Sequence, residues 1–116
     1  MGLEDILHHF KALERDPKCP DQLDVFLDLS ETESVPDAEQ ILIVADRLLH
    51  GIKRIRFGAC AIVAGHDAVF GMMRMFEAMA ERAFRVTGTF RNASEAEIWL
   101  AANRSPAYSE RPYRTG

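Results

Sequence analysis

The sequence predicts a single α/β domain with a parallel sheet of three strands in the order 1-2-3 and with helices mainly on one face. Three strand-length apolar segments alternate along the chain with segments of helical periodicity. The outer two strand segments alternate polar and apolar residues, whereas the middle one is apolar throughout. Strands joined by helices imply right-handed crossovers, and the half-polar outer strands imply that helices cover one face more than the other.

The chain begins with a predicted amphipathic helix and a strand. Residues 3–14 place apolar side chains at helical spacing, and prolines then end the helix. Residues 23–29, LDVFLDL, alternate in polarity. We therefore expect a strand whose polar side, with Asp24 and Asp28, faces water.

A second helix is expected to start near Ser34 or Asp37, because each has an acid or amide three residues on that completes a box-like cap. Gly51 follows the last apolar position and is expected to be a left-handed C-cap. The predicted buried stripe of this helix consists of Ile41, Val44, Ala45, Leu48 and Leu49.

The middle strand, residues 59–64, is apolar on both faces and fits the centre of a parallel sheet. A turn at Gly65 and His66 leads to a long helix, for which Asp67 is the expected N-cap. This helix is predicted to bury Val69, Met72, Met73, Phe76, Met79, Ala80 and Ala83, and to expose Arg74, Glu77 and Glu81.

The third strand, residues 84–90, alternates again and is predicted to expose Arg85, Thr87 and Thr89. Ser94 opens a capping-box sequence, and the last helix is expected to run to about Asn103. Residues 104–116 show no periodicity. We therefore place the domain at residues 1–103 and a flexible tail at 104–116.

Composition narrows the possible functions. The formal net charge is -4, which argues against a general nucleic-acid binder. No apolar run approaches the roughly 20 residues that span a bilayer, so we expect a cytoplasmic protein without a transmembrane segment. Cys19 and Cys60 support neither a disulfide framework nor a CxxC site, and both are expected to be reduced thiols.

Several stretches together resemble a known family. They are a strand ending in DLS, a helix opening with PDAEQ, and a central strand followed by FGMMRMFEAMAE. With a final capped helix, they resemble the STAS/SpoIIAA-like domains, especially the uncharacterised bacterial SpoIIAA-like branch, over residues 3–103. The resemblance implies a sheet with helices on one side and a non-enzymatic regulatory role with a protein partner.

Two departures limit what the resemblance implies. Antagonists that act as phospho-switches carry an Asp-Ser-Ser-Gly-like turn, where this chain reads Pro36-Asp37-Ala38-Glu39. The position of the usual phosphoacceptor serine is therefore Ala38, which has no hydroxyl. Family members also begin with extra strands, which this chain lacks before its first helix. An open sheet edge would follow, and we expect it to invite a partner strand or a homodimer.

No arrangement of residues predicts catalysis, a metal site or a cofactor. His8 and His9 are neighbours on a helix and point about 100° apart, so they cannot share a metal as an i, i+4 pair could. His66 and Asp67 could pair a base with its carboxylate, but a turn followed by its N-cap is the better explanation of these two neighbours. Cys60 lies inside a strand. We expect no enzyme activity and no cofactor.

The predicted function is therefore a non-enzymatic regulatory or protein-interaction domain, and the alternative is a carrier or sensor of a small apolar or anionic ligand. The contact surface is expected at the loops that follow the strands and at the helix ends that they feed. The apolar arc of the long helix, widened by Phe70 and Met75, is a second candidate face. The predicted interaction residues are Ser34, Asp37, Ala38, Glu39, His66, Asp67, Phe70 and Met75.

Overall fold

The structure is a computed structural model that describes residues 7, 8, 10–12, 15, 22–31, 35–51, 56–103 and 113–115. The described residues between 7 and 15 are helical, as predicted for the first helix. The elements that follow are β1 (Gln22–Asp28), α2 (Ala38–His50), β2 (Arg56–Val63), α3 (Asp67–Met79), β3 (Phe84–Phe90), α4 (Ala93–Asn103) and β4 (Tyr113–Thr115).

The strands form one parallel sheet in the order β3-β2-β1-β4. The predicted fold class and the order of the first three strands are confirmed. β4 is an addition: Tyr113–Thr115 pairs with Val25, Phe26 and Leu27 of β1. The prediction of a flexible tail missed this strand, and residues 104–112 lie outside the described residues.

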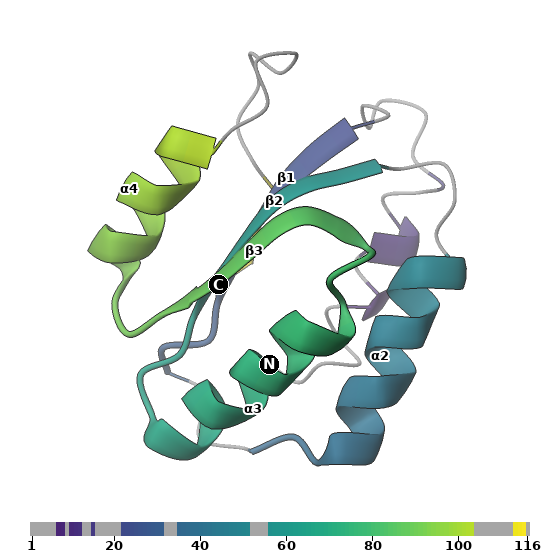
Figure 1. Cartoon of the computed structure of the whole chain (residues 1–116), viewed down its shortest axis with the longest axis horizontal. Helices are drawn as coiled ribbons and strands as arrows, with labels where there is room; N and C mark the ends of the chain where they lie inside the picture. Colours follow the sequence, from purple (N-terminus) through teal and green to yellow (C-terminus); the bar gives the residue numbers. More distant parts are fainter. Residues whose placement is uncertain are drawn as a thin grey trace.

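Helices cover the two faces of the sheet unequally (Figure 1). α2 and α3 pack on one face together with Leu7 and Phe10 of the N-terminal helical segment. A row of phenylalanines joins this segment to the sheet, since the Phe57 ring lies 5.1 Å from that of Phe10 and 5.3 Å from that of Phe84. Three helical segments therefore share one face, as predicted, and among the described helices only α4 lies on the other.

The face under α4 is buried at its centre, which corrects the prediction of a solvated side for β1. Phe26 of β1 is 1% exposed and packs in a second apolar cluster beneath α4. Gly88 of β3 leaves room there, since a Cβ would lie 2.9 Å from the Phe90 ring and 3.2 Å from Trp99. The other buried members of this cluster are Ala59, Ala61, Val63, Ala96 and Leu100.

The polar side of β3 also differs from the prediction. Thr89 is buried, and its hydroxyl donates a 2.9 Å hydrogen bond to the Glu77 carboxylate of α3. Thr87 is half-buried on the same side, and only Arg85 is exposed. The threonines therefore face α3, and Glu77 is not the solvent-exposed residue that the helical pattern predicts.

Asp24 is the second correction on β1, because it is only 3% exposed. Between the pairs Leu23–Phe57 and Val25–Cys60, β2 contains one residue more than β1, which makes a β-bulge. The Asp24 carboxylate accepts a 2.9 Å hydrogen bond from the amide of Ala59 in this bulge. Asp24 thus acts as an acceptor inside the sheet rather than as a surface charge.

The helix ends confirm one predicted cap and correct three. Asp37 and Gln40 form the expected capping box on α2, with hydrogen bonds of 2.8 and 3.0 Å. The N-cap of α3 is His66 rather than Asp67, because the helix starts one residue earlier than predicted. Asn92, not Ser94, accepts the amide of Glu95 at the start of α4. Gly51 has right-handed torsion angles, so it is not a left-handed cap.

We predict that Gly58→Ala lowers the free energy of unfolding by about 1–3 kcal/mol, as measured by urea denaturation. A Cβ at Gly58 would lie 2.3 Å from the Asp24 carboxylate, so the sheet must shift to admit it. Gly71→Ala is the control, since no atom lies within 4 Å of its Cβ position on the exposed side of α3. This second change should stabilise the protein by about 0.5–1 kcal/mol. Equal effects of the two variants would contradict the packing at the bulge.

Candidate functional site

α2 carries more apolar residues than the sheet can bury. Ile41, Leu42 and Ile43 are consecutive, and adjacent residues on a helix point about 100° apart, so one face cannot hold all three. Ile41 is fully buried, whereas Leu42 is 56% exposed and Ile43 is 46% exposed. The outer side of α2 is therefore apolar.

α3 carries exposed methionines on its side toward α2 and the solvent. Met73 is fully buried, but Met79 is 40% exposed and Met75 is 37% exposed. The prediction that Met79 lies in the buried stripe is wrong. The prediction of a widened apolar arc at Met75 agrees with its exposure.

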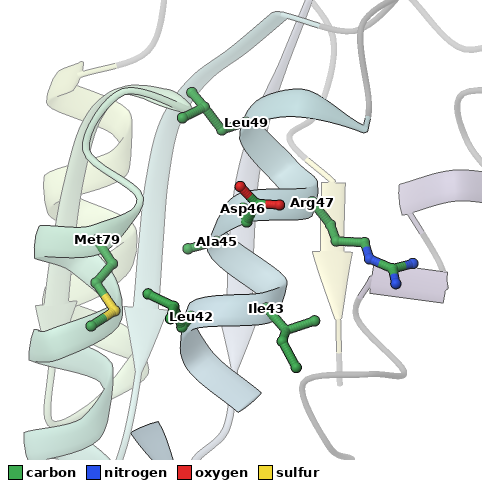
Figure 2. Close-up of a pocket in the computed structure, with 7 residues that line it drawn as sticks. All are labelled: Leu42, Ile43, Ala45, Asp46, Arg47, Leu49 and Met79. Atoms are coloured by element: carbon green, nitrogen blue, oxygen red, sulfur yellow. The ribbon is translucent and has the colours of Figure 1, made fainter. Parts of the chain in front are cut away.

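A surface pocket of about 640 Å³ lies along α2, and Met79 of α3 also lines it. We call it the α2–α3 groove. Figure 2 shows Leu42 of α2 pointing toward Met79 of α3, and Ile43 projecting from the other side of α2. The lining residues are Leu42, Ile43, Ala45, Asp46, Arg47, Leu49 and Met79.

The groove has both signs of charge on its α2 wall. Asp46 makes a 3.1 Å contact with His50 one turn later, and both side chains are largely exposed. Arg47 projects from α2 on the side of Ile43 (Figure 2). The groove therefore combines apolar side chains with one acidic and one basic group.

The predicted interaction residues on α2 lie at its N-terminal end. The side chain of Asp37 is engaged in the capping box, while Ala38 and Glu39 are exposed in the first turn. Ser34 lies outside the described residues. Val35, which precedes α2, is 50% exposed and adds an apolar side chain to the surface at this end of the helix.

The N-terminal end of α3, which carries predicted residues His66, Asp67 and Phe70, lies at the same end of the sheet as the N-terminal end of α2 (Figure 1). Asp67 forms an ion pair with Arg91, and the Arg91 guanidinium also sits 4.1 Å from the centre of the Phe70 ring. His66 is exposed and makes no side-chain hydrogen bond to cap α3. Because Asp67 is paired with Arg91, the two residues do not form a base and its orienting carboxylate.

Sequence reasoning missed the α2 wall of the groove. Leu42 and Ile43 were assigned to no surface, although the run Ile41–Ile43 contains the signal that some of these side chains must be exposed. Met75 is the only predicted interaction residue that belongs to the exposed apolar set. That set among the described residues is Val35, Leu42, Ile43, Met75, Met79 and Ile98, of which only Ile98 lies away from α2 and α3.

The described part of the chain contains neither a candidate metal site nor a reactive thiol. No group of three or more His, Cys, Asp or Glu side chains there is placed to hold a metal ion. Burial raises the pKa of the Cys60 thiol far above its ordinary value, and the negative charge of Glu77 raises it further. A thiolate is the nucleophilic form, so Cys60 is poorly suited to nucleophilic catalysis.

Comparisons of the chain with protein-family models, with curated proteins and with solved structures give no match. Among the described residues, no helix combines the length and the apolar character that crossing a membrane requires.

We predict that iodoacetamide at pH 8 does not alkylate Cys60 in the native protein, because the thiol is buried and protonated. Mass spectrometry of the peptide that contains Cys60 measures this, and labelling in urea gives the full signal. Glu77→Gln should leave Cys60 protected, since burial is the larger cause of the raised pKa. Rapid labelling of the native chain would contradict the buried placement.

Proposed function

We propose that the chain is a non-enzymatic regulatory or protein-interaction domain of the SpoIIAA-like type, and that a helix of its partner binds in the α2–α3 groove. The observation that carries this proposal is the exposure of Leu42, Ile43 and Met79 around one pocket. Exposed apolar side chains gathered in one place are typical of interaction sites.

The lining of the groove favours a helix as the ligand. Six of its seven residues belong to α2 and one, Met79, to α3, and an amphipathic helix that lays apolar residues at i, i+3 and i+4 against such an apolar helical surface is a common mode of recognition. Methionines suit this role because their flexible side chains adapt to the partner. Asp46 and Arg47 also line the groove, so they favour a partner helix with a basic and an acidic residue flanking its apolar stripe.

Regulation by phosphorylation of the usual serine does not form part of this proposal. Ala38 occupies the first turn of α2 and has no hydroxyl to accept a phosphate. Glu39 in the first turn of α2 and His66 at the start of α3 are exposed. In this proposal they form a second contact region near the groove and not a phosphorylation switch.

The second candidate function is a carrier or sensor of a small apolar ligand. The volume of about 640 Å³ favours it, because ligand pockets commonly measure roughly 300–1,000 Å³. Against it, Leu42 and Ile43 line the pocket while about half exposed, so the groove would leave much of a small ligand in water.

To identify the helix, a photo-crosslinking residue at position 42 is compared in cells with the same residue at position 98, and the captured partner is then purified. We predict that Leu42→Asp raises the Kd for this partner about tenfold to a hundredfold, because it places a charge where a leucine would be buried. Isothermal titration calorimetry measures the Kd. Ile98→Asp is the matched control, since Ile98 is 73% exposed on α4 and outside the groove.

Three results would contradict the groove as the docking site. A partner whose affinity survives Leu42→Asp but falls with Glu39→Ala and His66→Ala would bind at the loop ends. An equal loss from Leu42→Asp and Ile98→Asp would show an effect that is not specific to the groove. A small molecule that copurifies with the wild-type chain and is absent from Leu42→Asp in native mass spectrometry would favour the carrier.

A further inference from the structure

We infer that the helix that binds in the α2–α3 groove is α2 of a second copy of the chain, so that two copies form a symmetric dimer through their α2 helices. The inference rests on the proposed function, because it names the partner of the same groove. A twofold dimer presents the same surface from each copy, so this surface must complement itself. The outer side of α2 meets this requirement in both its apolar and its charged residues.

The apolar residues of α2 can meet their own copies. Leu42 and Ile43 are both about half exposed. In an antiparallel pair of α2 helices with the twofold axis at Ile43, this residue meets Ile43 of the second copy. Leu42 lies on the α3 side of α2 (Figure 2), and the rotation keeps that side of both copies on one side of the dimer. The two Leu42 side chains therefore come near each other beside the central isoleucines.

Charges on either side of Ile43 determine the orientation of the two helices. Glu39 lies four residues before Ile43 and Arg47 four residues after it, about 6 Å along the helix axis in each direction. An antiparallel arrangement therefore brings Glu39 of each copy beside Arg47 of the other and gives two ion pairs. A parallel arrangement would place Glu39 beside Glu39 and Arg47 beside Arg47, which is repulsive.

Both charged side chains are available for these pairs. Glu39 and Arg47 are exposed, and neither has an ion-pair partner among the described residues. Asp46 brings a like charge near Glu39 of the second copy. The His50 ring, 3.1 Å from the Asp46 carboxylate, weakens this repulsion when the ring is protonated.

The apolar residues then select the register. An axis between Asp46 and Arg47 would also allow two ion pairs, since each of these residues would lie opposite the other. That axis would place Ile43 opposite His50, and it would separate the two Leu42 residues by about 14 Å along the helices instead of about 3 Å. Only the axis at Ile43 combines ion pairs with the burial of apolar side chains.

α3 leaves room for the second copy. Its outward residues Ala68, Gly71, Met75 and Ala78 recur at helical spacing, and all four are exposed. No atom of the described chain lies within 4 Å of the Cβ position of Gly71. The charged Arg74 instead lines a pocket beside β3. The α2 helices can therefore approach to about 8–10 Å, the usual distance of packed helices, without a charged residue on this outward stripe of α3.

Sedimentation equilibrium of the full chain over a range of concentrations measures the Kd of the dimer. Glu39→Arg and Arg47→Glu should each raise this Kd about tenfold, because each variant replaces two ion pairs with two like-charge pairs. The double variant restores opposite charges across the axis, so its Kd should return to within about threefold of the wild-type value. Glu95→Arg is the matched control and should leave the dimer intact, since Glu95 lies in the first turn of α4 as Glu39 does in α2.

The photo-crosslinking residue at position 42 separates this inference from the proposed function. Capture of a second copy, together with the charge-reversal pattern, supports the dimer. Capture of a different protein by a chain that stays monomeric up to about 1 mM overturns the dimer and leaves the groove as a docking site. A monomer that captures nothing overturns both. A dimer that the single reversals leave unchanged, or that the double variant fails to restore, overturns the inference as well.

Discussion

The hydrogen bond from the Ala59 amide to the Asp24 carboxylate is the interaction on which the arrangement of the sheet depends. The bulge in β2 lets Phe57 and Cys60, three residues apart, contribute to the same apolar cluster beneath α2 and α3. Without an acceptor the extra amide would be buried and unpaired, which costs about 1–3 kcal/mol. Asp24 supplies that acceptor, and Gly58 supplies the space for it.

Unequal helical cover then determines which surfaces are available for binding. α2 and α3 share the first face of the sheet and bury the inner sides of their apolar arcs there, while α4 packs on the second face. The outer sides of α2 and α3, with Leu42 and Met79, line the α2–α3 groove. Within the described residues, β3 is the last strand at one side of the sheet and β4 pairs with β1 at the other. The position of the groove therefore follows from the order of strands and helices.

Periodicity and capping patterns were enough to predict β1, β2 and β3 and to name Asp37 as one of two candidate caps, because these features depend on short-range spacing. The order of the three strands followed from the wholly apolar character of the middle one. These patterns were not enough for Asp24, since alternation treats every aspartate in a strand as solvated and carries no information about a bulge in the neighbouring strand. β4 was missed because a three-residue strand has too few residues to show a period. For the groove, the sequence showed surplus apolar residues at Leu42 and Ile43, but only the packing of α2 against its neighbours shows which of them stay exposed.

A double-mutant cycle on Asp24→Ala and Gly58→Ala, followed by urea denaturation, tests the central claim most directly. If the carboxylate occupies the space beside Gly58, adding a Cβ there should cost less once Asp24 is alanine, with a coupling free energy of at least about 1 kcal/mol. Effects that add to within about 0.5 kcal/mol would show that the two residues do not touch, and would contradict the account of the bulge.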